Sequence, residues 1–199
     1  MLWPTLPGIA IFLTHALLFG FVARQIQGTE QAFLTEKLAY TGLACAAYTA
    51  YVFAARRLAM PMANPIAEGR RLESAIAAVG AGLGLYLLLQ AFLRFTGLFS
   101  GSERPIAKGL TILVSGLLTP MAEELLYRAG LFRFLRSTMP TAFALIVSSF
   151  CFAIVHPIVS APFILVCGLT FGVLYWRYGL MASILAHVVY NLLILLSAG

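Results

Sequence analysis

Long hydrophobic stretches constrain the folding of this chain more than any other feature. They amount to seven runs of roughly 20 predominantly apolar residues, the length that a helix needs to cross a bilayer. Of the 199 residues, 61% are hydrophobic and only 10% are charged, so a soluble domain of this length could not bury the apolar surface. The surrounding solvent must therefore be lipid. The runs extend approximately over residues 5–23, 38–55, 74–95, 108–132, 139–158, 161–177 and 180–198.

These runs predict helices, because unpaired backbone groups are not tolerated in hydrocarbon and the strict alternation of a β-barrel is absent from the sequence. We expect an all-α, polytopic transmembrane helix bundle with about seven spans. Six or eight spans are also compatible, because very short connections separate the last three runs. No linker or repeat suggests a second domain, so residues 1–199 are expected to form one integral-membrane domain with a motif-bearing core at about 105–198.

The net charge of +6 indicates a membrane orientation and not a nucleic-acid partner, because the basic residues lie mostly in short clusters between apolar runs. Seven of these residues fall on one side of the predicted spans and five on the other. The excess favours a cytoplasmic N-terminus in a multi-pass protein of the cell membrane. The richer side holds Arg56, Arg57, Arg70, Arg71, Arg133, Arg136 and Arg177, and the poorer side holds Arg24, Lys37, Arg94, Arg104 and Lys108.

Two pairs of glycines have the spacing that allows transmembrane helices to approach closely. Gly80 and Gly84 form one pair, and Gly168 and Gly172 form the other. Both pairs predict helix packing and nothing more.

The fourth run contains two adjacent carboxylates and an arginine near its middle, namely Glu123, Glu124 and Arg128. Each would cost several kcal/mol if it faced lipid alone. Glu124 and Arg128 lie one helical turn apart and can form an ion pair, which leaves Glu123 without that partner. Glu123 is therefore the candidate general base. A Ser-His-Asp triad is excluded, because all seven acidic residues are glutamates.

Two later runs carry further polar residues, as Phe152-x-x-x-His156 and His187-x-x-x-Asn191. Taken alone, the acidic pair with its arginine could be a structural ionic cluster. Three helices that each carry such groups can satisfy them by converging in the protein interior. We therefore expect one shared polar site.

Together these residues resemble the CPBP family, the CAAX-protease and bacteriocin-processing (Abi) group of glutamate-dependent intramembrane proteases. Three of its motifs occur in order: E-E-x-x-x-R from Glu123 to Arg128, F-x-x-x-H from Phe152 to His156, and H-x-x-x-N from His187 to Asn191. Each is short, but their order on three hydrophobic runs is fairly specific. The resemblance covers about residues 115–195.

The resemblance implies hydrolysis of a peptide bond by an activated water, without a covalent intermediate. By this analogy Glu123 and His156 would activate the water, and His187 and Asn191 would donate hydrogen bonds to the oxyanion. The supporting or substrate-binding residues would be Glu124, Arg128 and Phe152. No cofactor is implied. The expected partner is a peptide or protein substrate, including lipid-modified or membrane-anchored ones.

Other functions remain open from the residues alone. One glutamate and two histidines could bind zinc in a membrane hydrolase, although the sequence lacks H-E-x-x-H. Buried ionisable groups also occur in transporters, although here they all lie in the second half of the chain. The same fold could also serve in a non-catalytic immunity protein.

Overall fold

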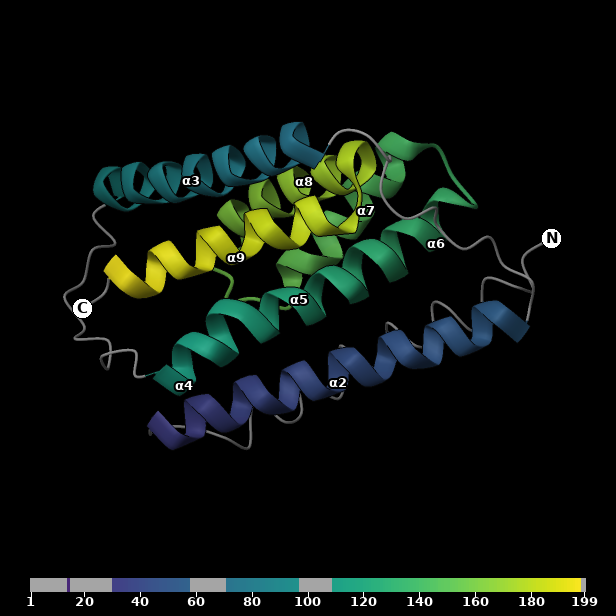
Figure 1. Cartoon of the computed structure of the whole chain (residues 1–199), viewed down its shortest axis with the longest axis horizontal. Coiled ribbons are helices and arrows are strands. Elements are labelled where there is room, and N and C mark those ends of the chain that lie inside the picture. Colours follow the sequence, from purple (N-terminus) through teal and green to yellow (C-terminus); the bar gives the residue numbers. More distant parts are fainter. Residues whose placement is uncertain (1–13, 15–29, 58–70, 97–108, 198–199) are drawn as a thin grey trace.

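The computed structural model describes residues 14, 30–57, 71–96 and 109–197, and every regular element in these ranges is a helix. The predicted all-α fold is therefore confirmed for this part of the chain. Figure 1 shows a bundle in which one long helix crosses the centre. The elements are α2 (Glu30–Arg57), α3 (Arg71–Thr96), α4 (Gly109–Thr111), η2 (Ile112–Leu118), α5 (Thr119–Glu124), η3 (Leu125–Phe132), α6 (Arg133–Arg136), α7 (Thr141–Ile154), α8 (Ala161–Tyr178) and α9 (Leu180–Ser197).

Within the described ranges, four helical segments are long and apolar enough to cross a membrane. They are Arg71–Phe95, Gly109–Arg136, Ala161–Tyr178 and Leu180–Ser197, and each corresponds to a predicted span. The expected total of about seven is not confirmed. The predicted span 5–23 lies outside the described residues, and the predicted span 38–55 falls within α2, which is not among the four.

The predicted span 139–158 is shorter in the structure than the sequence suggested. Helix α7 has 14 residues, a rise of about 21 Å against the roughly 30 Å of a hydrocarbon core. It ends at Ile154, three residues before Pro157, whose ring disfavours helix at the residue before it. A turn at residues 155–160 then leads into α8, so α7 and α8 form a hairpin whose first arm does not cross the membrane by itself.

The long helix from Gly109 to Arg136 is not a uniform α-helix. Seven residues before α5 and eight residues after it are π-helical, with the wider turn that this geometry gives. Helix α5 itself begins at Thr119 with Pro120 in its first turn, where the missing N–H of proline is tolerated.

Helix α9 lies at the centre of the packing. It contacts α3, α8, η2 and α5, while α2 packs against α5 and η3 on another side of the long helix. Helix α8 ends at Tyr178, and the next residue, Gly179, has a positive φ of 86° that permits the sharp reversal into α9.

The predicted role of the glycine pairs is confirmed for Gly168 and Gly172. A Cβ on Gly168 would meet Ser149 at 3.0 Å, and Gly172 is packed against Leu145, so α8 approaches α7 closely there. By contrast, no atom of the described residues lies within 4 Å of a Cβ on Gly80 or Gly84. The close approach of α3 to α9 is made by Gly82, whose hypothetical Cβ would lie 2.6 Å from the backbone oxygen of Ala186.

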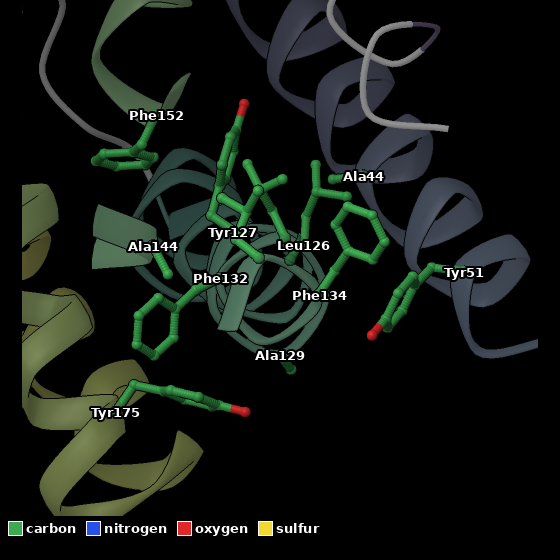
Figure 2. Close-up of a cluster of buried hydrophobic side chains, with 13 residues drawn as sticks. Ala44, Tyr51, Leu126, Tyr127, Ala129, Phe132, Phe134, Ala144, Phe152 and Tyr175 are labelled. Carbon is green, nitrogen blue, oxygen red and sulfur yellow. The ribbon is translucent and has the colours of Figure 1, made fainter. Parts of the chain in front are cut away.

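Two clusters of buried apolar side chains form the core. Figure 2 shows the first, around η3, where Leu126 and Phe132 pack with Phe152 of α7 and Tyr175 of α8. The second joins α3, α8 and α9 and includes Phe171.

Candidate active site

Glu123 and Glu124 lie at the end of α5, near the middle of the long central helix. Both are buried, with 5% and 0% of their surface exposed. The π-helical segment η3 begins at the next residue and carries Arg128, which is also fully buried. Three buried ionisable groups therefore lie on one short stretch of helix.

Glu124 is the most extensively bonded of these groups. Its Oε2 lies 3.3 Å from Arg128 Nε and accepts a hydrogen bond from the Ser183 hydroxyl. Its Oε1 lies 2.9 Å from His187 Nδ1. A carboxylate with a guanidinium, an imidazole and a hydroxyl around it is held in one orientation, which suits a structural anchor.

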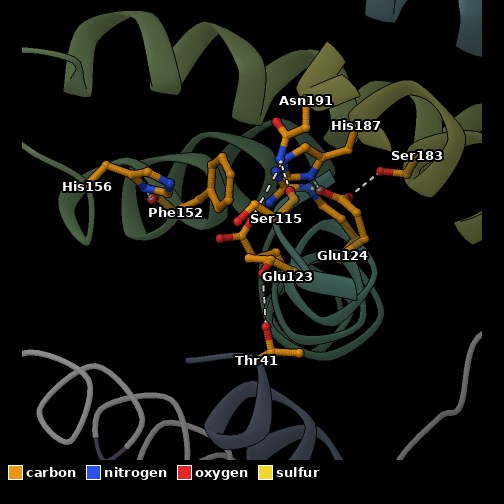
Figure 3. Close-up of polar contacts among 11 residues, drawn as sticks. Thr41, Ser115, Glu123, Glu124, Phe152, His156, Ser183, His187 and Asn191 are labelled. Carbon is orange, nitrogen blue, oxygen red and sulfur yellow. Dashed lines mark hydrogen bonds and ion pairs between the residues drawn. The ribbon is translucent and has the colours of Figure 1, made fainter. Parts of the chain in front are cut away.

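His187 connects the two glutamates, as Figure 3 shows. While Nδ1 faces Glu124, Nε2 lies 3.4 Å from Glu123 Oε2. The ring is stacked on Phe171 at a centroid distance of 4.4 Å and meets the Phe152 ring edge-on at 5.9 Å. One aromatic side chain from each apolar cluster thus fixes the plane of the imidazole.

Asn191 lies one turn beyond His187 on α9, and its Nδ2 donates a hydrogen bond to the backbone oxygen of Ser115 at 3.0 Å. The Ser115 oxygen can accept this hydrogen bond because the sequence removes its usual backbone donor. In the π-helical pattern the Thr119 N–H bonds to Val114 O, so the next bond would join residue 120 to Ser115 O. Pro120 has no N–H, and the Asn191 amide takes its place.

Arg128 has a second neighbour besides Glu124. Its guanidinium carbon lies 4.9 Å from the centroid of the Phe152 ring, a cation–π contact. Neither of its terminal nitrogens has a hydrogen-bond partner within the described part of the chain. The ion pair and the ring are therefore the contacts that stabilise this buried cation.

His156 lies on the other side of Phe152 from His187. Its ring meets Phe152 edge-on at 4.9 Å, and Figure 3 shows Phe152 between the two histidines. His156 Nδ1 lies 2.8 Å from Phe152 O. Since a carbonyl oxygen can only accept, Nδ1 carries the proton, and Nε2 of a neutral ring is left as an acceptor.

Of the site residues expected from the sequence, the structure brings Glu123, Glu124, Arg128, His187 and Phe152 into one contact network. Asn191 is beside it on the next turn of α9. His156 reaches it through the Phe152 ring, and the imidazole that pairs with Glu123 is His187.

One residue of the network that the sequence analysis missed is Ser183. It precedes His187 by one helical turn, so Ser183, His187 and Asn191 form a series with four-residue spacing on one face of α9. That periodicity was a usable signal. The Ser183 hydroxyl also donates to Phe171 O at 3.0 Å, so it is one of the residues that fix α9 against α8.

A catalytic zinc centre needs three protein ligands around one point. No group of three or more His, Cys, Asp or Glu side chains within the described ranges is placed to hold a metal ion. The two histidines expected as ligands lie on opposite sides of Phe152 (Figure 3).

A polar cluster enclosed by apolar helices, several of them long enough to cross a bilayer, defines the class: a helical membrane protein with an intramembrane polar site. Residues 105–193 match the family model described as Type II CAAX prenyl endopeptidase Rce1-like. The match confirms, over this segment, the resemblance to the CAAX-protease family that the motifs predicted. The family implies a protease with a peptide or protein substrate. Comparison with curated proteins and with solved structures gave no match.

Proposed function

We propose that this protein is an intramembrane endopeptidase in which Glu123 activates the hydrolytic water. The observation that supports this role is the contrast between adjacent carboxylates. Glu124 is surrounded by Arg128, Ser183 and His187, whereas Glu123 forms an ion pair with His187, whose Nε2 lies 3.4 Å from its carboxylate. The less constrained carboxylate is the better one to take and return a proton.

His187 is proposed to donate to the oxyanion of the tetrahedral intermediate. Glu124 Oε1 lies 2.9 Å from Nδ1 and fixes the ring, and the proposed donor to the oxyanion is Nε2–H. Nε2 is then the nitrogen left on the side of Glu123, where the water would attack. The Asn191 amide has a second N–H besides the one given to Ser115 O, and this would be the other donor.

His156 is proposed to assist Glu123 in positioning the water. Its tautomer supports this assignment, because the hydrogen bond from Nδ1 to Phe152 O leaves Nε2 free to accept a proton. The step needs no covalent intermediate: a water proton passes to the base, the oxygen adds to the carbonyl carbon, and the proton returns to the leaving amine as the peptide C–N bond breaks.

The proposed substrates are proteins that end in a prenylated CAAX sequence, which the family description supports. The proposed location is the cell membrane. Arg56 and Arg57 at the end of α2, Arg133 and Arg136 in α6, and Arg177 in α8 lie at one end of the bundle (Figure 1). This end is proposed to face the cytoplasm, as the N-terminus is.

The test uses purified protein in detergent or liposomes with a fluorescence-quenched, S-prenylated peptide that ends in a CAAX sequence. We expect release of the C-terminal tripeptide, identified by mass spectrometry. Glu123→Gln and His156→Ala should each abolish cleavage, and His187→Ala and Asn191→Ala should each lower kcat by about a hundredfold or more.

Glu73→Gln is the matched control, because Glu73 lies on the exposed part of α3 and accepts a hydrogen bond from Tyr178, remote from the site. Full activity of Glu123→Gln would refute the proposed base. If the peptide is not cleaved, comparison of membrane-protein C-termini between cells with wild-type protein and with Glu123→Gln would identify another substrate. Loss of activity with a zinc chelator, restored by added zinc, would instead support a metal-dependent hydrolase.

A further inference from the structure

Asn191 is held in place by a backbone carbonyl of the long helix. Its Nδ2 donates to Ser115 O at 3.0 Å, and Figure 3 shows this bond joining the two residues. The segments that carry them, α9 and η2, are packed closely here, since a Cβ on Gly116 would lie only 2.7 Å from Leu192 Cδ2. The amide of Asn191 therefore reaches the carbonyl directly, from one helix to the next.

Pro120 leaves that carbonyl without a donor from its own helix. In the π-helical pattern of η2 the Thr119 N–H bonds to Val114 O, so the N–H of residue 120 would face Ser115 O. Proline has no N–H, and the Pro120 side chain is fully buried in the first turn of α5. A helical carbonyl that lacks its axial partner needs another donor and can tilt outward to reach it, here toward α9.

The geometry of a carboxamide connects this contact to the proposed chemistry. The two N–H bonds of a primary amide lie in one plane, so a hydrogen bond from one fixes the direction of the other. The second N–H of Asn191 is the proposed donor to the oxyanion, one turn beyond His187 on α9. We propose that Pro120 is a positioning residue for Asn191, because it withholds a backbone donor from Ser115 O and so leaves this oxygen to orient the amide. This inference rests on the proposed function of Asn191.

The first experiment measures steady-state kinetics of Pro120→Val and Pro120→Ala on the prenylated CAAX peptide. Both variants supply the missing N–H, and Val also fills most of the buried volume of the proline ring. The new N–H should draw Ser115 O back toward the helix axis. We expect kcat to fall about tenfold or more in both variants, with KM changed by less than about twofold, because the oxyanion forms only after the substrate is bound.

Pro140→Ala is the matched control for these kinetics. Pro140 lies exposed at the start of α7, outside the site, and its replacement should leave kcat at the wild-type value. A role in folding alone would lower kcat in any background, whereas a positioning role needs Asn191. Pro120→Val combined with Asn191→Ala should therefore have the kcat of Asn191→Ala alone, within about twofold. Wild-type kcat in Pro120→Val, or a further loss of about tenfold in the double variant, would overturn the proposal.

The second experiment does not depend on activity. The chain contains two asparagines, Asn64 and Asn191, so protein with isotopically labelled asparagine gives two side-chain carboxamide signals in NMR spectra in detergent, and Asn191→Ala assigns them. In Pro120→Val the hydrogen-bonded proton of Asn191 should move upfield, because the bond to Ser115 O is lost. An unchanged Asn191 signal would overturn the proposal. If the signal moves but wild-type protein cleaves nothing, the proposed function fails while the role of Pro120 in holding the amide is supported.

Discussion

Adjacent glutamates differ here because their neighbours differ. Glu124 faces a guanidinium, an imidazole nitrogen and a hydroxyl, while Glu123 faces the other nitrogen of the same imidazole. Arg128 supplies the positive charge that faces Glu124 within this buried cluster. Removing a single member should therefore have consequences that depend on which charge is left without a partner.

Glu124→Gln is expected to destabilise the fold much more than Glu123→Gln. The amide would leave the fully buried Arg128 without its counter-charge, at a cost of about 3–5 kcal/mol, whereas Glu123→Gln should cost about 1 kcal/mol or less. Unfolding by denaturant in detergent micelles measures both free energies. The double variant Glu124→Gln/Arg128→Met serves as the control, because removal of the orphaned cation should recover most of the loss. Equal destabilisation by both single variants would contradict the assignment of Glu124 as the anchor.

The sequence predicted the members of the cluster better than their contacts. Burial of charge in lipid is so costly that Glu123, Glu124, Arg128 and His187 had to meet in the interior, and four-residue spacing identified their shared faces. Which imidazole pairs with Glu123 depends on the Phe152 ring, and no spacing along the chain encodes that ring's position.

At the scale of elements, hydrophobic length predicted the four long apolar segments but overestimated the helix before His156. Pro157 ends the regular pattern early, and the apolar residues after it, Ile158 and Val159, form an exposed turn instead of a last helical turn. The spacing rule for small residues also needed the structure. It selected Gly80 and Gly84 and not Gly82, because the face that meets α9 depends on how α3 is rotated about its axis.

Gly82→Ala is expected to weaken the contact between α3 and α9. A Cβ there would meet the backbone oxygen of Ala186 at 2.6 Å and Val189 Cβ at 2.9 Å, so the helices must separate, at about 1–3 kcal/mol. Because Ala186 precedes His187, the shift should also lower peptidase activity. Gly80→Ala and Gly84→Ala are matched controls with open space at the new Cβ, and they should be neutral or stabilising by up to about 1 kcal/mol. Thermal unfolding and kcat of the three variants provide the comparison. A loss at Gly80 or Gly84 as large as that at Gly82 would contradict the packing.

At the scale of the whole molecule, the distribution of arginine predicts how the bundle is oriented in the membrane. The described arginines of α2, α6 and α8 lie in the last turns of those helices, and Figure 1 places these helix ends together. Glu123 lies about 20 Å along the helix axis from Arg136, roughly half the length of the continuous helix Gly109–Arg136. A basic end held at the cytoplasmic surface would therefore place the base near the middle of the bilayer, where few waters compete with the substrate for its carboxylate.

This orientation predicts which engineered thiols a membrane-impermeant maleimide can reach in intact cells. Ser137 lies exposed in the turn after α6, at the arginine-rich end, and Ser197 lies exposed at the opposite end, where α9 finishes. In a background with Cys45, Cys151 and Cys167 replaced by Ala, Ser197→Cys should be labelled in intact cells and Ser137→Cys only after permeabilisation, because the positive end is retained on the cytoplasmic side. The background variant itself controls for non-specific labelling, and retained cleavage of the prenylated peptide shows that each variant is folded. The reverse pattern would place the arginine-rich end outside. Since prenylated proteins are cytoplasmic, it would also require their C-termini to reach Glu123 from the end of the bundle where α9 finishes.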